Sequence, residues 1–129
     1  MALSETLVIA DEANVAKNFV QIERSGTLVR RIDDASNLSL PVTCVISHNT
    51  SGKGDSIVDR HLVQFAKTEL DTNGAPVTSV VNMTIAAPRA LTSSLATSQE
   101  LVGYAVNFLL GVNAARSFVN LPAITIGES

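Results

Sequence analysis

The sequence has few charged residues and a single cysteine, and each shortage excludes a class of protein. Of its 129 residues 16% are charged and 46% are hydrophobic, and the net charge is −3. A chain of this composition is neither disordered nor strongly basic, so any binding of nucleic acid must come from a local surface. Because Cys44 is the only cysteine, an intrachain disulfide framework and a thiolate metal cluster are both excluded.

A long apolar run and a basic leader are also missing. No stretch approaches the roughly 18 apolar residues of a membrane-spanning helix, and the first ten residues, MALSETLVIA, contain no basic residue. We therefore expect a soluble product that stays where it is made. The length favours a single domain over residues 1–129, without internal repeats or low-complexity segments.

Short alternating segments bounded by turn residues predict an antiparallel sheet. The expected strands are residues 6–10, 16–24, 27–33, 38–47, 57–70 and 77–86. The first strands include an N-terminal hairpin, and the last three form a meander across the loop 49–56 and the turn Asp71–Pro76. Pro88 is expected to end the sheet, because proline cannot donate to a strand ladder.

The most apolar stretch of the chain, Thr97–Val112, predicts the main helix. Thr97 followed by Glu100 has the spacing of a capping box. Apolar side chains then cover most of the circumference, and the expected sheet is too small to bury such a helix on all sides. A second copy of the chain is therefore expected to cover it. A shorter helix is expected over Ala114–Val119, with Asn113 as its cap. The residues expected at the dimer interface are Leu101, Val102, Tyr104, Ala105, Phe108 and Leu109.

Alternation within the three meander strands divides their side chains between two faces of the sheet. The apolar sets are expected on the face that helices cover, and they are Val42/Cys44/Ile46, Val63/Phe65 and Val81/Met83/Ile85. The opposite face is expected to remain open and to carry Thr43, Val45, Ser47, Arg60, Leu62, Gln64, Val80, Asn82 and Thr84. A polar face is solvated surface by default, but the apolar members of this one suit contact with an unstacked base.

Candidate catalytic and metal-binding groups are few. His61 is expected on the same face as Cys44 and roughly opposite it, which is an arrangement that can activate a nucleophile. On a covered face a free cysteine more often packs as a small hydrophobic residue, so we expect no enzyme and no cofactor. Metal binding by His48, His61 and Asp59 is not expected, because sequence neighbours on a strand point to opposite faces and no helical i, i+4 pair exists. The segment SGKGDS lacks the spacing of a phosphate-binding loop.

Three short motifs follow one another in a recognisable order. They are VTC at Val42–Cys44, VNM at Val81–Met83 with Pro88 closing the same strand, and the ELV…LLG run of Glu100–Gly111. Together with the layout of hairpin, meander and two C-terminal helices, they resemble the coat proteins of the single-stranded RNA bacteriophages, the levivirus type, over nearly the whole chain. The resemblance implies an α+β fold and an interlocked dimer, in which the helices of each subunit lie over the sheet of its partner.

The resemblance also implies a function. Dimers of this family tile an icosahedral shell with the open sheet face turned toward the genome, and the same face binds an RNA hairpin to repress replicase translation. The implied partners are further copies of the chain and single-stranded RNA, in a virion assembled in the cytoplasm of a bacterial host. The positions implied to face RNA are the nine residues of the open face given above. The loop implied to make contacts between dimers consists of Asp71, Thr72, Asn73, Gly74, Ala75 and Pro76.

One departure from the family pattern affects the strength of RNA binding. Relatives generally place several lysines and arginines on the open face, whereas Arg60 is the only cation that the three meander strands are expected to place on it. Phosphate contacts dominate the affinity for nucleic acid, so we expect modest binding. The alternative from another class is a small cellular homodimeric binding module that uses the same open face for a ligand or peptide.

Overall fold

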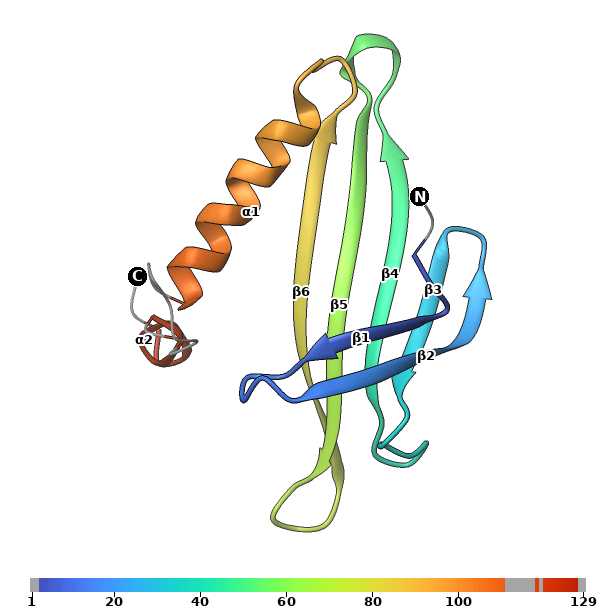
Figure 1. Cartoon of the computed structure of the whole chain (residues 1–129), viewed down its shortest axis with the longest axis vertical. Coiled ribbons are helices and arrows are strands. Elements are labelled where there is room, and N and C mark those ends of the chain that lie inside the picture. The colour runs from blue at the N-terminus through green and yellow to red at the C-terminus, as the bar shows by residue number, and fades with distance from the viewer. Residues whose placement is uncertain (1–2, 111–117, 119, 128–129) are drawn as a thin grey trace. The chain divides into compact units, whose positions relative to one another are not determined.

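The computed structural model describes residues 3–110, 118 and 120–127 (Figure 1). It forms two compact units, Met1–Ala90 and Leu91–Ser129. The first unit is one six-stranded antiparallel sheet with the strand order β1-β2-β3-β4-β5-β6, and the second contains the helices α1 and α2. The predicted antiparallel sheet followed by helices is confirmed, while the single domain over residues 1–129 stays a prediction.

The strands follow the predicted segments closely at most boundaries. Their bounds are β1 Thr6–Ala10, β2 Ala16–Ser25, β3 Leu28–Asp33, β4 Val42–Ser51, β5 Val58–Leu70 and β6 Pro76–Pro88. The fourth strand differs most, because it was expected over residues 38–47. In the structure the Asn37 side chain accepts hydrogen bonds from the backbone N–H groups of Ser39 and Leu40. This local bonding competes with a strand ladder, and β4 begins only after it.

The β1–β2 and β5–β6 hairpins are closed by the same five-residue turn. In each, the N–H of an aspartate, Asp11 or Asp71, donates to the carbonyl four residues later. The aspartate carboxylate accepts the N–H groups two and four residues later. The fourth position has a positive φ, 62° at Asn14 and 80° at Gly74, which these two residue types tolerate best. The turn Asp71–Pro76 was predicted from the sequence, and the other turn closes the predicted N-terminal hairpin.

The N-terminal hairpin supplies part of the core. Phe19 of β2 packs edge-to-face against Phe65 of β5, with ring centroids 6.0 Å apart, although β3 and β4 separate their strands in the sheet. The sheet must therefore curl, and Figure 1 shows β1 and β2 crossing the longer strands. Beneath this hairpin Cys44 is 1% exposed. The hairpin thus covers the apolar face of β4 and β5 within a single chain.

A buried arginine ties the N-terminal segment to the sheet. Arg31 lies directly opposite Cys44 and is 2% exposed. Its Nε and Nη2 atoms donate to the backbone carbonyls of Glu5 and Ser4 at 3.2 and 2.8 Å. Burial raises the pKa of the Cys44 thiol, and the positive charge of Arg31 opposes that rise. Cys44 is therefore a packed, protonated side chain at neutral pH.

In the second unit, α1 spans Ser94–Leu110 and begins one turn earlier than predicted. The N–H of Thr97 donates to the carbonyl of Ser93, so Thr97 lies inside the helix and the predicted capping box is wrong. None of the α1 residues is buried, and the large side chains of Leu101, Tyr104 and Phe108 are 59%, 63% and 53% exposed. No helix in the described part of the chain is long and apolar enough to cross a membrane.

The short helix α2 spans Leu121–Thr125, a segment in which no helix was predicted. Proline in its first turn suits a helix start, because the first N–H groups of a helix have no intrahelical partner. The side chain of Asn120 donates to the carbonyl of Phe108 at 2.6 Å and so connects α2 to α1. The helix predicted over Ala114–Val119 falls on residues that are, except for residue 118, outside those described.

Candidate nucleic-acid interface

Strand register places the nine predicted residues on one face of the sheet. Ser47, Leu62 and Thr84 lie side by side across β4, β5 and β6, and Val45, Gln64 and Asn82 form the next row. We call this surface the open face, and it consists of Arg30, Thr43, Val45, Ser47, Asn49, Arg60, Leu62, Gln64, Val80, Asn82 and Thr84. Asn49 joins it opposite Arg60. Asn49 was not predicted on this face, because β4 was expected to end at Ser47.

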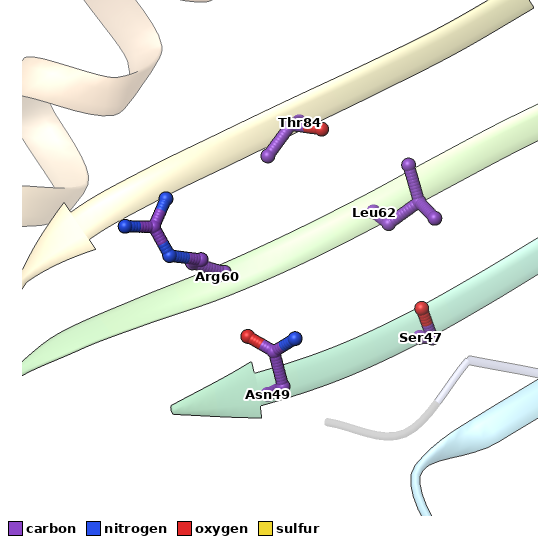
Figure 2. Close-up of a pocket in the computed structure, with 5 residues that line it drawn as sticks. All are labelled: Ser47, Asn49, Arg60, Leu62 and Thr84. Atoms are coloured by element: carbon purple, nitrogen blue, oxygen red, sulfur yellow. The ribbon is translucent and has the colours of Figure 1, made fainter. Parts of the chain in front are cut away.

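A shallow pocket of about 200 Å³ lies at one end of the open face. Figure 2 shows its lining side chains on three neighbouring strands, and they are Ser47, Asn49, Arg60, Leu62 and Thr84. Leu62 supplies apolar surface, and the other four supply hydroxyl, amide and guanidinium groups around it. The Nε of Arg60 donates to the hydroxyl of Ser51 at 3.2 Å, which fixes the position of the guanidinium. This combination suits a flat ring with polar edges next to an anionic group.

Two amides orient each other in the middle of the open face. Gln64 Nε2 donates to Asn82 Oδ1 at 2.9 Å, and the two residues are directly paired in the ladder. The bond uses one donor of Gln64 and the carbonyl oxygen of Asn82. The pair therefore still offers the carbonyl oxygen of Gln64 and the N–H groups of Asn82, in fixed positions, to a bound group.

The open face has a second cation, which was not predicted to lie there. Arg30 of β3 lies directly opposite Val45, and its side chain is 49% exposed. It forms a long ion pair with Glu23 at 3.9 Å. The imperfect alternation of residues 27–33 did not assign Arg30 to a face, whereas the β3–β4 register does. Val45 itself is 8% exposed and has little surface to offer to a ligand.

The predicted cysteine–histidine arrangement is not formed. Cys44 lies opposite Phe65, and His61 lies opposite His48. Four residues separate Phe65 from His61, which at ~3.3 Å per residue places Cys44 and His61 roughly 13 Å apart along the strand. The expectation that they lie roughly opposite each other is wrong. Among the described residues, no three or more histidine, cysteine or acidic side chains are grouped so that they could hold a metal ion.

Comparisons with known proteins find similarity in structure and none in sequence. No protein-family model and no curated protein matches the sequence. The virus-like particle of bacteriophage AVE019 matches with a TM-score of 0.60 at 16% identity, over 100% of this chain and 99% of that one. The virus-like particle of bacteriophage NT-214 matches with 0.62 at 19% identity, over 99% of both chains. The coat protein of bacteriophage EMS014 matches with 0.60 at 14% identity, over 86% of this chain and 76% of that one.

The fold is that of a bacteriophage coat protein. The predicted coat-like α+β fold is therefore confirmed, and the motifs at Val42–Cys44 and Val81–Met83 mark β4 and β6 of this fold. In this fold the open face is formed by strands β3 to β6, and the pocket around Arg60 lies on that face.

Proposed function

We propose that this protein is a capsid structural protein whose copies assemble into an icosahedral shell. The observation that carries the proposal is the coat-protein fold, which covers at least 99% of this chain and 99% of the matched chain in each of two bacteriophage virus-like particles. The likeness is therefore to an entire shell subunit and not to a shared module. The proposed role is structural and not catalytic. The proposed location is the virion, which is assembled in the cytoplasm of a bacterial host.

The free edge of the sheet supports a dimer as the building block. Among the described residues, β6 has a neighbouring strand only on its β5 side. Its 13 residues contain no charged side chain, its prolines stand only at the two ends, and Val80 and Val81 are 48% and 69% exposed. An edge without charges or bulges is a template for a further strand. In the proposed dimer, β6 pairs with β6 of a second copy, and the two open faces form one continuous surface.

The composition of α1 supports the same building block. Its apolar side chains are exposed in the single chain, and an aqueous environment opposes that exposure. In the proposed interlocked dimer, α1 of each subunit lies over the apolar face of the partner's sheet. The six residues proposed at this interface are Leu101, Val102, Tyr104, Ala105, Phe108 and Leu109.

The open face is the surface that the proposal assigns to single-stranded RNA. Arg30 and Arg60 supply positive charge for phosphates, and the paired amides of Gln64 and Asn82 supply directional hydrogen bonds for bases. The pocket beside Leu62 provides an apolar contact for an unstacked ring. A hairpin with unpaired loop bases matches these features, and binding of such a hairpin is the proposed route to repression of replicase translation.

Electron microscopy of the purified protein tests the shell. We expect uniform spherical particles, and a preparation that contains only dimers under all assembly conditions would contradict the proposal.

The turn Asp71–Pro76 is proposed to contact neighbouring dimers, so deletion of Thr72–Ala75 should change the size of the shells or abolish them while dimers persist. Deletion of Glu12–Val15 is the matched control, because it removes the same type of turn from the β1–β2 hairpin. Shells unchanged by the first deletion would make the turn a simple connector.

A further inference from the structure

The two histidines of the chain lie face to face on neighbouring strands. His48 of β4 is directly paired with His61 of β5, and their Nδ1 atoms are 2.8 Å apart. The ring centroids are 5.0 Å apart, and the ring planes are inclined by 70°. Both side chains project on the side of the sheet opposite the open face. Alternation along one strand could not reveal this pair, because its members come from two strands and meet only through the register.

His48 and His61 need only a change of tautomer in one ring to act together as two metal ligands. In the hydrogen bond, one Nδ1 carries the proton and the other accepts it. If the donor ring keeps its proton on Nε2 instead, both Nδ1 lone pairs face the same gap and no proton is lost overall. Neutral imidazole is a common ligand of divalent zinc, copper and nickel. We propose that His48 and His61 form a two-histidine site for a divalent transition-metal ion.

The spacing of the two nitrogens favours a particular coordination angle. Two metal–nitrogen bonds of ~2.0–2.1 Å that meet at a right angle hold the nitrogens roughly 2.9 Å apart, whereas the tetrahedral angle needs roughly 3.3 Å. The separation in the structure is 2.8 Å. Right-angled ligands are typical of tetragonal Ni²⁺ and Cu²⁺, and tetrahedral ligands are typical of Zn²⁺. The site should therefore prefer Ni²⁺ or Cu²⁺ over Zn²⁺.

The nearest carboxylate is already engaged. Asp59 lies two residues from His61 on the same face of β5, but Arg89 donates to both of its oxygens, at 2.6 and 3.1 Å, and Thr50 donates at 3.1 Å. The described residues offer no third metal ligand beside the histidines. Water therefore completes the coordination, so the ion should exchange freely while it clamps β4 to β5.

Calorimetric titration of the untagged full chain with Ni²⁺ tests the site. We expect saturable binding of one Ni²⁺ per chain, and binding at least tenfold weaker in either His48→Asn or His61→Asn. The chain has two histidines in all, so the double variant gives the baseline from the chain terminus and carboxylates. Asparagine retains a polar side chain, and circular dichroism of each variant checks the fold. Ni²⁺ should bind the wild type more tightly than Zn²⁺.

Hydrogen exchange gives a second measurement that needs no variant. Ni²⁺ should slow amide exchange in residues 46–50 of β4 and 59–63 of β5, because it links the two strands, and should leave β1 unchanged. The proposal is overturned if the wild type binds Ni²⁺ no more tightly than the double variant. It is also overturned if the slowed amides lie outside these two segments.

Discussion

Cys44 is a side chain whose protonation is linked to folding. Burial raises the pKa of its thiol above the ordinary value, although the neighbouring charge of Arg31 opposes this. In the unfolded chain a thiol ionises near pH ~8.5. Above that pH the folded state holds a proton that the unfolded state has lost, so stability is complete below this range and falls as the pH rises toward the folded pKa.

Urea denaturation between pH 7 and 10 tests this linkage. The free energy of unfolding of the wild type should fall, relative to Cys44→Ala, by up to about 1.4 kcal/mol for each pH unit above ~8.5. Loss of the side chain lowers the stability of the variant at every pH, but that offset does not depend on pH. The prediction therefore concerns only the difference between the two proteins in the slope of the free energy of unfolding against pH. Parallel profiles for the two proteins would show that the folded thiol ionises as easily as the unfolded one.

Individual residues were predictable wherever a strand alternates cleanly. The sets on β4, β5 and β6 were assigned to the correct faces because apolar and polar side chains alternate at most positions there, although Val45, Leu62 and Val80 are apolar members of the open face. Arg30 and Arg31 were not assigned, because adjacent arginines show no alternation, yet one lies on the open face and the other is 2% exposed. What separates them is their pairing with Val45 and Cys44. That pairing depends on the register between β3 and β4, and the local sequence of β3 does not determine it.

Among the elements, strands and turns were easier to predict than helix ends. The aspartate turns have side-chain hydrogen bonds that follow from the residue types within five positions. The start of α1 is less determined, because Ser93, Ser94 and Thr97 can each cap a helix. Leu95 and Ala96 favour helix, so the earlier start includes them and α1 begins at Ser94. The additional turn of helix before Thr97 therefore stabilises the chain more than a capping box at Thr97 would.

The open face, which spans the four strands β3 to β6, leads to a prediction about the effect of salt on RNA binding. Arg30→Ala and Arg60→Ala should each weaken binding to all RNAs about equally, and each should reduce the slope of log affinity against log salt by about 1. Asn82→Ala should instead weaken some hairpins more than others, according to the loop base, because an oriented amide reads a base edge. The measurement is a salt titration of RNA binding for the wild type and the three variants.

Lys67 provides the matched control for this titration. It lies on the same strand as Arg60 but on the other face of the sheet, where it pairs with Glu69 at 2.7 Å. Lys67→Ala changes the net charge as much as the arginine variants do, and it should leave the salt slope unchanged. If all four variants bind like the wild type, the open face does not touch RNA and packaging occurs elsewhere on the subunit.

At the scale of the whole molecule, a single chain leaves much apolar surface uncovered. The buried hydrophobic side chains among the described residues are Phe19, Val29, Cys44 and Val45, all in the sheet unit. On β6, Val81 and Met83 are 69% and 42% exposed, and α1 has no buried residue. Such a core is small for a stable fold, because apolar burial is the main favourable term. The apolar circumference of α1 predicts a partner from the sequence alone, and the dimer stays a prediction.

Phe108 is the side chain that tests the proposed dimer most directly. It is 53% exposed in the single chain, where truncation to alanine would cost little. If a second copy buries it, Phe108→Ala should lower the free energy of unfolding by about 3–5 kcal/mol and favour dissociation. Leu38→Ala is the control, because Leu38 is apolar, 84% exposed and outside both β6 and α1. It should change stability by less than about 0.5 kcal/mol.

The concentration dependence of unfolding separates a dimer from a stable monomer. When folding and association are linked, the midpoint of thermal unfolding rises with protein concentration. The reason is that native chains associate into the dimer and unfolded chains do not. We expect this rise for the wild type below the concentration at which shells form, and a lower midpoint at every concentration for Phe108→Ala. Analytical ultracentrifugation over the same range identifies the species present. A folded wild-type monomer that persists on dilution, with a midpoint independent of concentration, would mean that β6 and α1 are stable in water without a partner, and the interlocked dimer would have to be abandoned.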